Sequence, residues 1–148
     1  MTKMRMQSGV AIAEFGAALV ILIPVVLTSA LAAIVAFQAY MIHSALNQSA
    51  TLAARRLAIS YCLNPEYTMA NTKAIFKNIT NMQIVKSEDQ FEVPTGNAGW
   101  NLDATPPTVT VVVTFKSGQY GCAAFPNPDP LKMGNSFKLT ARATASLE

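Results

Sequence analysis

The feature that most constrains this chain is a run of 23 consecutive uncharged residues from Phe15 to Phe37. A helix needs about 20 apolar residues to cross a hydrocarbon core roughly 30 Å thick, so the run can span a bilayer with some tilt. Pro24 lies inside the run, but proline is tolerated in membrane helices and marks a kink more often than an end. We therefore expect one transmembrane helix near the N-terminus.

The basic residues around the run predict its orientation. Lys3 and Arg5 precede it, and the next basic residues are Arg55 and Arg56. Because lysine and arginine are retained on the cytoplasmic side, we expect a cytoplasmic N-terminus and export of the chain beyond about Tyr40. The net charge of +3 is too small and too scattered to indicate a nucleic-acid surface, so no nucleic-acid partner is expected.

One carboxylate, Glu14, stands at the start of the apolar helix. A charged acid near a helix centre costs about 2.5–3.5 kcal/mol on insertion, so its presence needs an explanation. In a plain signal anchor, Glu14 is a lone carboxylate at the cytoplasmic interface. In a cleaved secretory signal, Ala30-Leu31-Ala32 is the cleavage site and the mature chain begins at Ala33, although the apolar run continues past that point.

A third interpretation accounts for the acid. A short basic leader ends at Gly9, and Val10-Ala11-Ile12-Ala13-Glu14-Phe15 then leads directly into the apolar helix. This pattern resembles the type IV prepilin processing signal. Within that superfamily it is most similar to the TadE-like pseudopilins (minor pilins) of the tight-adherence, or Flp-type, pilus. The resemblance covers about residues 8–37 and continues more weakly through LNQSATLAARRLAISY.

The resemblance implies a role for each residue of this motif. A prepilin peptidase would cut between Gly9 and Val10, with Glu14 and Phe15 contributing to peptidase recognition and to assembly. Glu14 would become the fifth mature residue, and its carboxylate would pair with the new amino group of a neighbouring subunit. Its place in the first turn of the new helix also favours an anion, because of the helix macrodipole. Val10 departs from the phenylalanine that major type IV pilins usually carry.

The same resemblance implies partners and a location. The partners would be the prepilin peptidase, other pilin and pseudopilin subunits, the inner-membrane pilus assembly platform and membrane lipid. The chain would be a single-pass protein of the bacterial inner membrane. Its N-terminus would be cytoplasmic and its C-terminal head periplasmic or extracellular, with incorporation into a surface pilus as a further step.

Beyond the apolar run the helical pattern continues and becomes amphipathic. One apolar stripe recurs at spacings of three and four residues: Ile42, Leu46, Ala50, Ala53, Leu57 and Tyr61. Asn47, Gln48, Thr51 and Arg55 fall on the opposite side. Since no glycine or proline interrupts this part, we expect one continuous helix over residues 10–61.

The rest of the chain has the sequence pattern of a small β-sheet. Residues 108–115 and 137–147 place apolar side chains at every second position, which predicts two antiparallel strands with one face on the helix stripe. A helix is expected from Asn64 to about Asn78, and short strands over 83–86 and 90–93. The expected fold class is α+β: a long N-terminal transmembrane α-helix continues into an amphipathic helix, which a small antiparallel β-sheet head packs against.

This organisation predicts four parts of the chain. They are a prepilin leader (1–9), a transmembrane helix (10–37), an amphipathic extension (38–61) and an exported head (62–148). Two long turn-rich segments of the head carry Trp100, Tyr120 and Phe125. These aromatic residues are expected either to form a contact surface or to fold back over a thin core.

The head contains Cys122, and Cys62 stands at its start. Two cysteines in an exported domain suggest one disulfide bond, and two unpaired thiols are the alternative. Closing a loop of this length would contribute about 4 kcal/mol in the chain-entropy model. It would also tie the second turn-rich segment to the end of the helix.

The sequence contains little that indicates an enzyme. Its one histidine, His43, is expected at the membrane surface, and there is no glycine-rich phosphate loop, no H-E-x-x-H and no G-x-S-x-G. We expect no catalytic residue, no metal site and no cofactor. The expected function is that of a minor pilin or pseudopilin, a structural subunit for assembly of a Flp-type pilus or a related secretion filament. The alternatives are an exported binding module on an uncleaved signal anchor, and a major filament subunit.

Overall fold

The computed structural model describes residues 3–77, 79, 84–129, 132 and 134–147. Two compact units divide the chain, residues 1–37 and residues 38–148. The elements follow one another in this order: α1 (Lys3–Leu63), α2 (Pro65–Ala70), α3 (Thr72–Lys77), the 3-10 helix η1 (Glu88–Gln90), β1 (Phe91–Glu92), η2 (Gly96–Ala98), β2 (Trp100–Asn101), β3 (Thr108–Lys116), η3 (Gly134–Ser136) and β4 (Lys138–Ser146).

The first element, α1, is a helix of 61 residues that continues through Pro24. The continuous helix expected over residues 10–61 is therefore confirmed. Residues 11–37 of α1 make up most of the first unit, and residues 38–63 belong to the second. With the sheet that follows, this helix gives the α+β fold that the sequence predicts.

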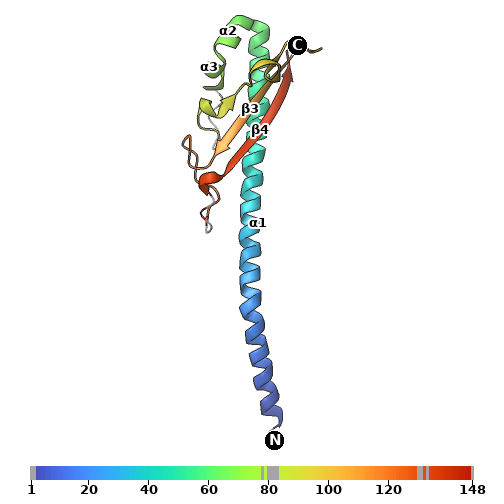
Figure 1. Cartoon of the computed structure of the whole chain (residues 1–148), viewed down its shortest axis with the longest axis vertical. Helices are drawn as coiled ribbons and strands as arrows, with labels where there is room; N and C mark the ends of the chain where they lie inside the picture. Colours follow the sequence, from blue (N-terminus) through green and yellow to red (C-terminus); the bar gives the residue numbers. More distant parts are fainter. Residues whose placement is uncertain (1–2, 78, 80–83, 130–131, 133, 148) are drawn as a thin grey trace. The chain divides into compact units, whose positions relative to one another are not determined.

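The second unit contains a four-stranded antiparallel sheet with β3 at its centre. One edge of β3 pairs with β4 along the whole strand, from Thr108 opposite Ser146 to Lys116 opposite Lys138. The other edge pairs with two short strands, β1 at the middle of β3 and β2 at its first residues. The long ribbon formed by β3 and β4 is visible in Figure 1, where both strands are labelled.

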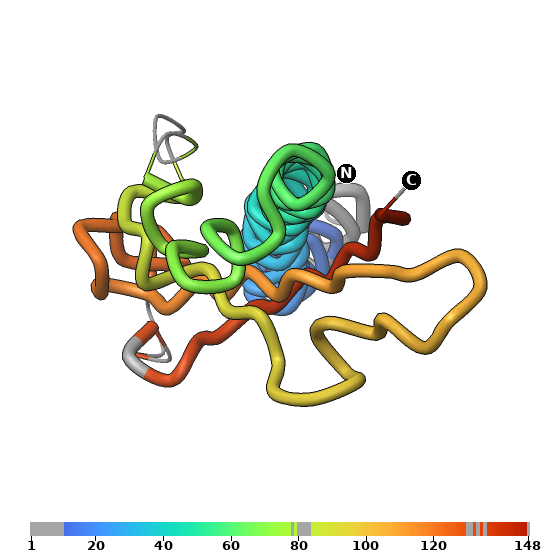
Figure 2. The backbone as a smooth tube through the Cα atoms, turned by 90° about the horizontal axis from the view of Figure 1, so that it is seen from above, coloured from blue at the N-terminus to red at the C-terminus, as the bar shows by residue number. Residues whose placement is uncertain are grey.

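The core of the second unit lies between one face of this sheet and one stripe of α1. The apolar residues predicted at the helix stripe are buried, apart from the half-buried Tyr61: Ile42, Leu46, Ala50, Ala53 and Leu57. The apolar face of β3 is also buried: Val109, Val111, Val113 and Phe115. Viewed along α1, the sheet runs beside the helix (Figure 2). The polar side of the helix, Asn47, Gln48, Thr51 and Arg55, stays exposed, as expected.

The segment after α1 forms two short helices where one was predicted. The Oδ1 of Asn64 accepts a hydrogen bond from the amide of Tyr67 at 3.1 Å, so the predicted helix start is confirmed. Asn71 then ends α2, because its amide and its Nδ2 both donate to the carbonyl oxygen of Tyr67. The prediction of a single helix was therefore wrong at Asn71, and its expected end at Asn78 lies outside the described residues.

Of the two short strands predicted, one is present and one is absent from the described residues. The strand expected over 90–93 is confirmed in the shorter form of β1. The strand expected over 83–86 is absent from Ile84–Lys86, and Gln83 lies outside the described residues. Because the amide of Lys86 donates to the Oε1 of Gln90 at 2.7 Å, it is used in a local turn instead of a ladder.

Aromatic residues of the turn-rich segments fold back onto the second unit. Trp100 lies in β2 with its ring centroid 5.3 Å from that of Tyr61. Phe125 is buried, and its ring centroid lies 4.2 Å from that of Phe137. Tyr120 is half-buried. These contacts favour the interpretation in which the segments cover a thin core.

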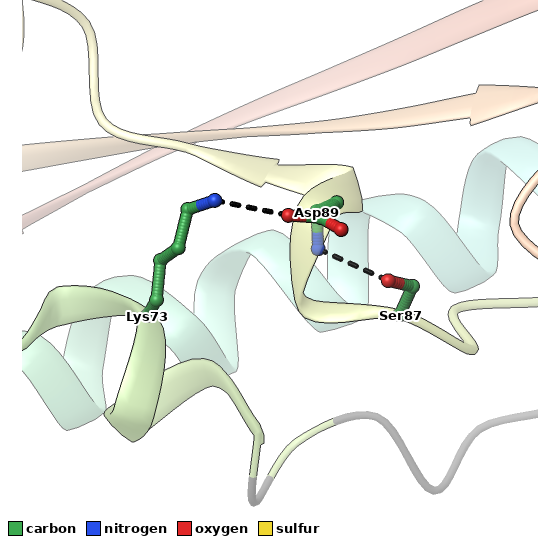
Figure 3. Close-up of polar contacts among 3 residues, drawn as sticks. All are labelled: Lys73, Ser87 and Asp89. Atoms are coloured by element: carbon green, nitrogen blue, oxygen red, sulfur yellow. Dashed lines mark hydrogen bonds and ion pairs between the residues drawn. The ribbon is translucent and has the colours of Figure 1, made fainter.

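An exposed ion pair connects α3 with η1. The Nζ of Lys73 lies 3.0 Å from the Oδ1 of Asp89 (Figure 3). The hydroxyl of Ser87 accepts a hydrogen bond from the amide of Asp89, which caps η1. Both charged side chains are more than half exposed, so water screens their attraction and the pair orients the turn more than it stabilises the fold.

Candidate assembly site

The residues of the predicted processing motif lie in the first unit. The backbone of α1 passes through Gly9 and Val10 without interruption. Glu14 follows Val10 by four residues, which is about one helical turn, so both positions lie on one side of the helix. Glu14 is exposed, and Phe15 is 66% exposed. Glu14 and Phe15 are thus presented on a helix surface rather than inside a folded core.

Glu14 is isolated within its surroundings. It is the only ionisable side chain among residues 11–37, and no hydrogen-bond donor contacts its carboxylate in the part of the chain that the structure describes. The unit that contains Glu14 exposes many large apolar side chains: Ile12, Phe15, Val20, Ile21, Leu22, Ile23, Val25, Val26, Leu27, Ile34 and Phe37. Within a bilayer, a carboxylate on such a helix is costly unless a charged group of another chain pairs with it.

The polar groups in the middle of the apolar helix are satisfied by the helix itself. The Oγ1 of Thr28 donates to the carbonyl oxygens of Pro24 at 2.9 Å and Val25 at 3.0 Å. The Oγ of Ser29 donates to the carbonyl oxygen of Val25 at 2.7 Å. A hydrocarbon environment requires this kind of internal satisfaction, because it offers no water to a hydroxyl group.

Length and composition therefore agree with a membrane span. Among the described residues, α1 is the one helix long and apolar enough to cross a membrane, and it lies near the N-terminus. The 27 residues from Ala11 to Phe37 would extend about 40 Å at 1.5 Å per residue, which exceeds a hydrocarbon core of roughly 30 Å.

The predicted disulfide bond between Cys62 and Cys122 is not formed, and both thiols are free. The Sγ of Cys62 donates to the carbonyl oxygen of Leu147 at 3.6 Å. The amide of Leu147 in turn donates to the carbonyl oxygen of Pro107, the residue before β3. The Sγ of Cys122 donates to the carbonyl oxygen of Ile84 at 3.1 Å, near the opposite end of β3.

The length of β3 is the physical reason for this correction. The two thiols are held near positions 107 and 114 of the chain, seven residues apart along a strand. Seven residues at about 3.3 Å each correspond to roughly 23 Å. A disulfide needs Cα atoms within about 7 Å of each other, so this pairing does not fit the fold.

The two thiols also differ in their surroundings. Cys62 is exposed, whereas Cys122 is buried. Burial raises the pKa of the Cys122 thiol, because desolvation disfavours the thiolate; nearby Lys86 and a hydrogen bond to Gln90 oppose this to a smaller extent. Cys122 is therefore a neutral thiol of the core, and a reactive role would fall to Cys62 if to either.

Gln90 organises the polar part of this core, and it was not among the residues predicted from the sequence. Its side chain is 1% exposed, although it lies between charged residues in the sequence. A signal was present in the spacing of Ser87 and Gln90, because S-x-x-Q is the pattern of a capping box and the structure forms one there. The pattern predicts the cap but not the burial of the amide.

Comparison of the chain with protein-family models, with curated proteins and with solved structures gave no match. Within the residues that the structure describes, no group of three or more His, Cys, Asp or Glu side chains is placed to hold a metal ion.

Proposed function

We propose that this chain is a minor pilin or pseudopilin, a structural subunit for assembly of a Flp-type pilus or a related secretion filament. The observation that carries the proposal is the position of Glu14, one turn beyond Gly9 and Val10 on an exposed apolar helix. Cleavage after Gly9 would place a new amino group at the start of that helix. The resemblance to TadE-like pseudopilins rests on the same residues.

The chemistry of the first unit supports this proposal. Residues 11–37 contain one ionisable side chain, Glu14, and therefore no positive charge that could pair with its carboxylate. Subunits packed side by side would supply the match, because the amino group of one Val10 can reach the carboxylate of the next Glu14. Neutralising both removes an insertion cost of about 2.5–3.5 kcal/mol for the acid and fixes the axial offset between subunits.

The proposal also assigns a location and partners. The N-terminus would lie in the cytoplasm, α1 would cross the bacterial inner membrane once, and residues 62–148 would form a periplasmic or extracellular head. A prepilin peptidase, other pilin subunits, the inner-membrane assembly platform and membrane lipid would be its partners. The chain itself would act as a substrate of the peptidase and not as an enzyme.

The test is the N-terminal residue and intact mass of the protein isolated from its native membrane. We expect a chain that begins at Val10. A chain that begins near Met1 in cells with an active prepilin peptidase would overturn the proposal and favour a plain signal anchor. A chain that begins at Ala33 would indicate an ordinary secreted domain in which Glu14 has no mature role.

A further inference from the structure

The hydrogen bonds at the ends of the β3–β4 ribbon determine which groups of β4 point outward. The amide of Ser117 donates to the carbonyl oxygen of Phe137, and the amide of Leu147 donates to that of Pro107. Both pairs continue the register of the β3–β4 ribbon, and both consist of odd-numbered residues. Hydrogen-bonded pairs alternate along an antiparallel ladder. The even-numbered residues of β4 therefore direct their amides and carbonyls away from β3: Lys138, Thr140, Arg142, Thr144 and Ser146.

These outward groups form an open sheet edge. The strand pairs with β3 alone. Within the described part of the chain, no main-chain hydrogen bond reaches the five outward amides and carbonyls. Proteins usually protect such an edge with charged side chains, a proline, a bulge or a covering element, and of these β4 carries only the charges of Lys138 and Arg142. This strand has no proline, and its nine residues pair with β3 in an unbroken register.

A groove runs beside this edge. It has a volume of about 350 Å³ and lies between α1 and the end of β4, lined by Thr51, Arg55, Ala58, Ile59, Thr144, Ala145 and Ser146. A second hollow shares Thr51 and Arg55 and extends along the helix to Asn47. A chain that paired with β4 would thus contact the short side chains of this groove and the exposed Ile59.

The charged side chains at this edge are basic on both faces. Arg55 is exposed on the α1 side. Lys138 is exposed on the other face of β4, and so is Arg142, whose Nη2 reaches across β3 to donate to the carbonyl oxygen of Ala98 at 3.2 Å. An added strand with acidic side chains would meet opposite charges on both of its faces, which favours pairing.

The same charges argue against a second copy of this chain at the edge. Two β4 strands paired antiparallel through their middle residues bring Arg142 of one copy opposite or diagonal to Arg142 of the other, or opposite its Lys138. Like charges in these positions destabilise a strand pair. These charges favour a different chain as the partner.

We propose that the outer edge of β4 and the groove beside it bind an extended, acidic segment of another protein by strand addition. Main-chain hydrogen bonds to the five outward residues would provide affinity, and the three basic side chains would select acidic sequences. This inference does not depend on the proposed role of Glu14, because it uses the second unit alone.

The first experiment follows amide exchange by NMR in the full chain, solubilised in detergent micelles. We expect fast exchange at Thr140, Arg142 and Thr144 and slow exchange at Ala141 and Ala143, which bond β3. The probe is a blocked nonapeptide that alternates valine with glutamate and threonine. It is expected to slow exchange at the three outward amides. Protection of those amides in the free protein at every concentration would overturn the proposal, as would protection that rises with protein concentration through self-association.

A matched pair of variants tests the hydrogen bonds. Thr144→Pro removes one outward amide, while Thr144→Val keeps it; both lose the hydroxyl contact between Thr144 and Thr110. We expect Thr144→Pro to weaken peptide binding by at least about fivefold, since losing one main-chain bond to the added strand costs on the order of 1 kcal/mol or more. The Thr144→Val variant should bind within about twofold of the original chain. Slow exchange at Ala141 in both variants verifies folding, and equal binding by both would overturn the proposal.

Charge is tested separately, so that the inference survives a misfolded proline variant. A peptide with lysine in place of glutamate should bind less well than the acidic one. The Arg142→Glu variant should narrow or reverse that preference, because it replaces an attraction by a repulsion. If the lysine peptide binds the original chain as tightly as the acidic one, the edge does not select acidic segments and the proposal fails.

Discussion

The Nε2 of Gln90 donates a hydrogen bond to the carbonyl oxygen of Thr114 at 3.2 Å, which fixes the segment before β1 against the edge of β3. The same nitrogen donates to the carbonyl oxygen of Ile84 at 3.3 Å. The Oε1 accepts from the amides of Lys86 at 2.7 Å and Ser87 at 3.1 Å. One buried side-chain amide thus accepts from two main-chain amides and donates to two main-chain carbonyls, and the carbonyl oxygen of Ile84 also accepts from the Sγ of Cys122.

We predict that Gln90→Leu destabilises the second unit by about 2–4 kcal/mol, because each buried main-chain group left unsatisfied costs about 1–3 kcal/mol and some regain water. Urea unfolding of the full chain in detergent micelles would measure this free energy. Gln119→Leu is the matched control: its side chain is exposed, so the free energy of unfolding should change by less than about 0.5 kcal/mol. Equal effects of the two substitutions would contradict the assigned role of Gln90.

The buried stripe of α1 predicts a contrast between two leucines of one helix. Leu57 is fully buried, whereas Leu63 is 82% exposed. Leu57→Ala should lower the free energy of unfolding by about 2–5 kcal/mol, since it removes buried methyl groups and leaves a cavity. Leu63→Ala should change it by less than about 0.5 kcal/mol. The same urea titration measures both, and a large loss with Leu63→Ala would show that this residue is buried in an assembly.

The two cysteines should react with iodoacetamide at different rates. Cys62 is exposed and should be modified quickly in the native chain. Cys122 is buried and its pKa is raised, so it should react slowly until the chain unfolds. Intact mass before and after modification, with and without prior reduction, measures both rates. A chain that needs reduction before either cysteine reacts would contain the disulfide that this structure lacks.

The raised pKa of Cys122 also predicts a dependence of stability on pH. The folded state keeps the thiol neutral above the ordinary pKa of 9.0, whereas the unfolded state releases the proton. The contribution is therefore fully present below pH 9 and is lost as the pH rises through the raised pKa. We expect Cys122→Val to reduce this alkaline loss of stability, measured as the free energy of unfolding between pH 7 and pH 11. An identical decline in the variant would assign the loss to other groups.

The ion pair between Lys73 and Asp89 predicts a second, smaller dependence of stability on pH. A hydrogen bond and the charge of Asp89 raise the pKa of Lys73 above its ordinary 10.5. The pair should therefore stabilise the fold fully below pH 10.5 and lose its effect as the pH rises through the raised pKa. The Lys73→Met variant should show a slightly lower melting temperature at pH 8, and the difference should shrink in high salt and at alkaline pH. A difference that salt leaves unchanged would point to packing by the lysine stem.

The strongly periodic parts of this fold were predictable from the sequence. The buried positions of α1 recur at helical spacing, and the apolar side chains of β3 and β4 alternate with more exposed ones, so the faces of these elements and the pairing of β3 with β4 followed from hydrophobic periodicity. Ala141 is buried on β4 as this alternation requires. Such long patterns constrain the fold because a shift of one residue would expose the whole apolar face.

The errors fall where a local polar contact outweighs the pattern. Asn71 ends α2 through two hydrogen bonds to one carbonyl, which no propensity of the surrounding residues indicates. The amide of Lys86 bonds the side chain of Gln90 and leaves the expected strand unformed. The predicted disulfide required Cys62 and Cys122 to lie at the same end of β3, and the sequence contains no measure of that distance.

The last prediction concerns Glu14 and rests on its proposed pairing with the amino group of a neighbouring subunit. Glu14→Gln keeps the size of the side chain but removes the charge, which would leave that amino group unmatched at membrane depth at a cost on the order of 2.5–3.5 kcal/mol. We expect the variant to be cleaved after Gly9 yet to fall by at least about tenfold in sheared surface fibres, measured by immunoblot against the membrane fraction. Glu14→Asp, which keeps the charge, should be recovered at an intermediate level. In a plain anchor the carboxylate has no partner, so Glu14→Gln would insert at least as well as the original chain; recovery of this variant in the same amount as the original would therefore contradict the pairing.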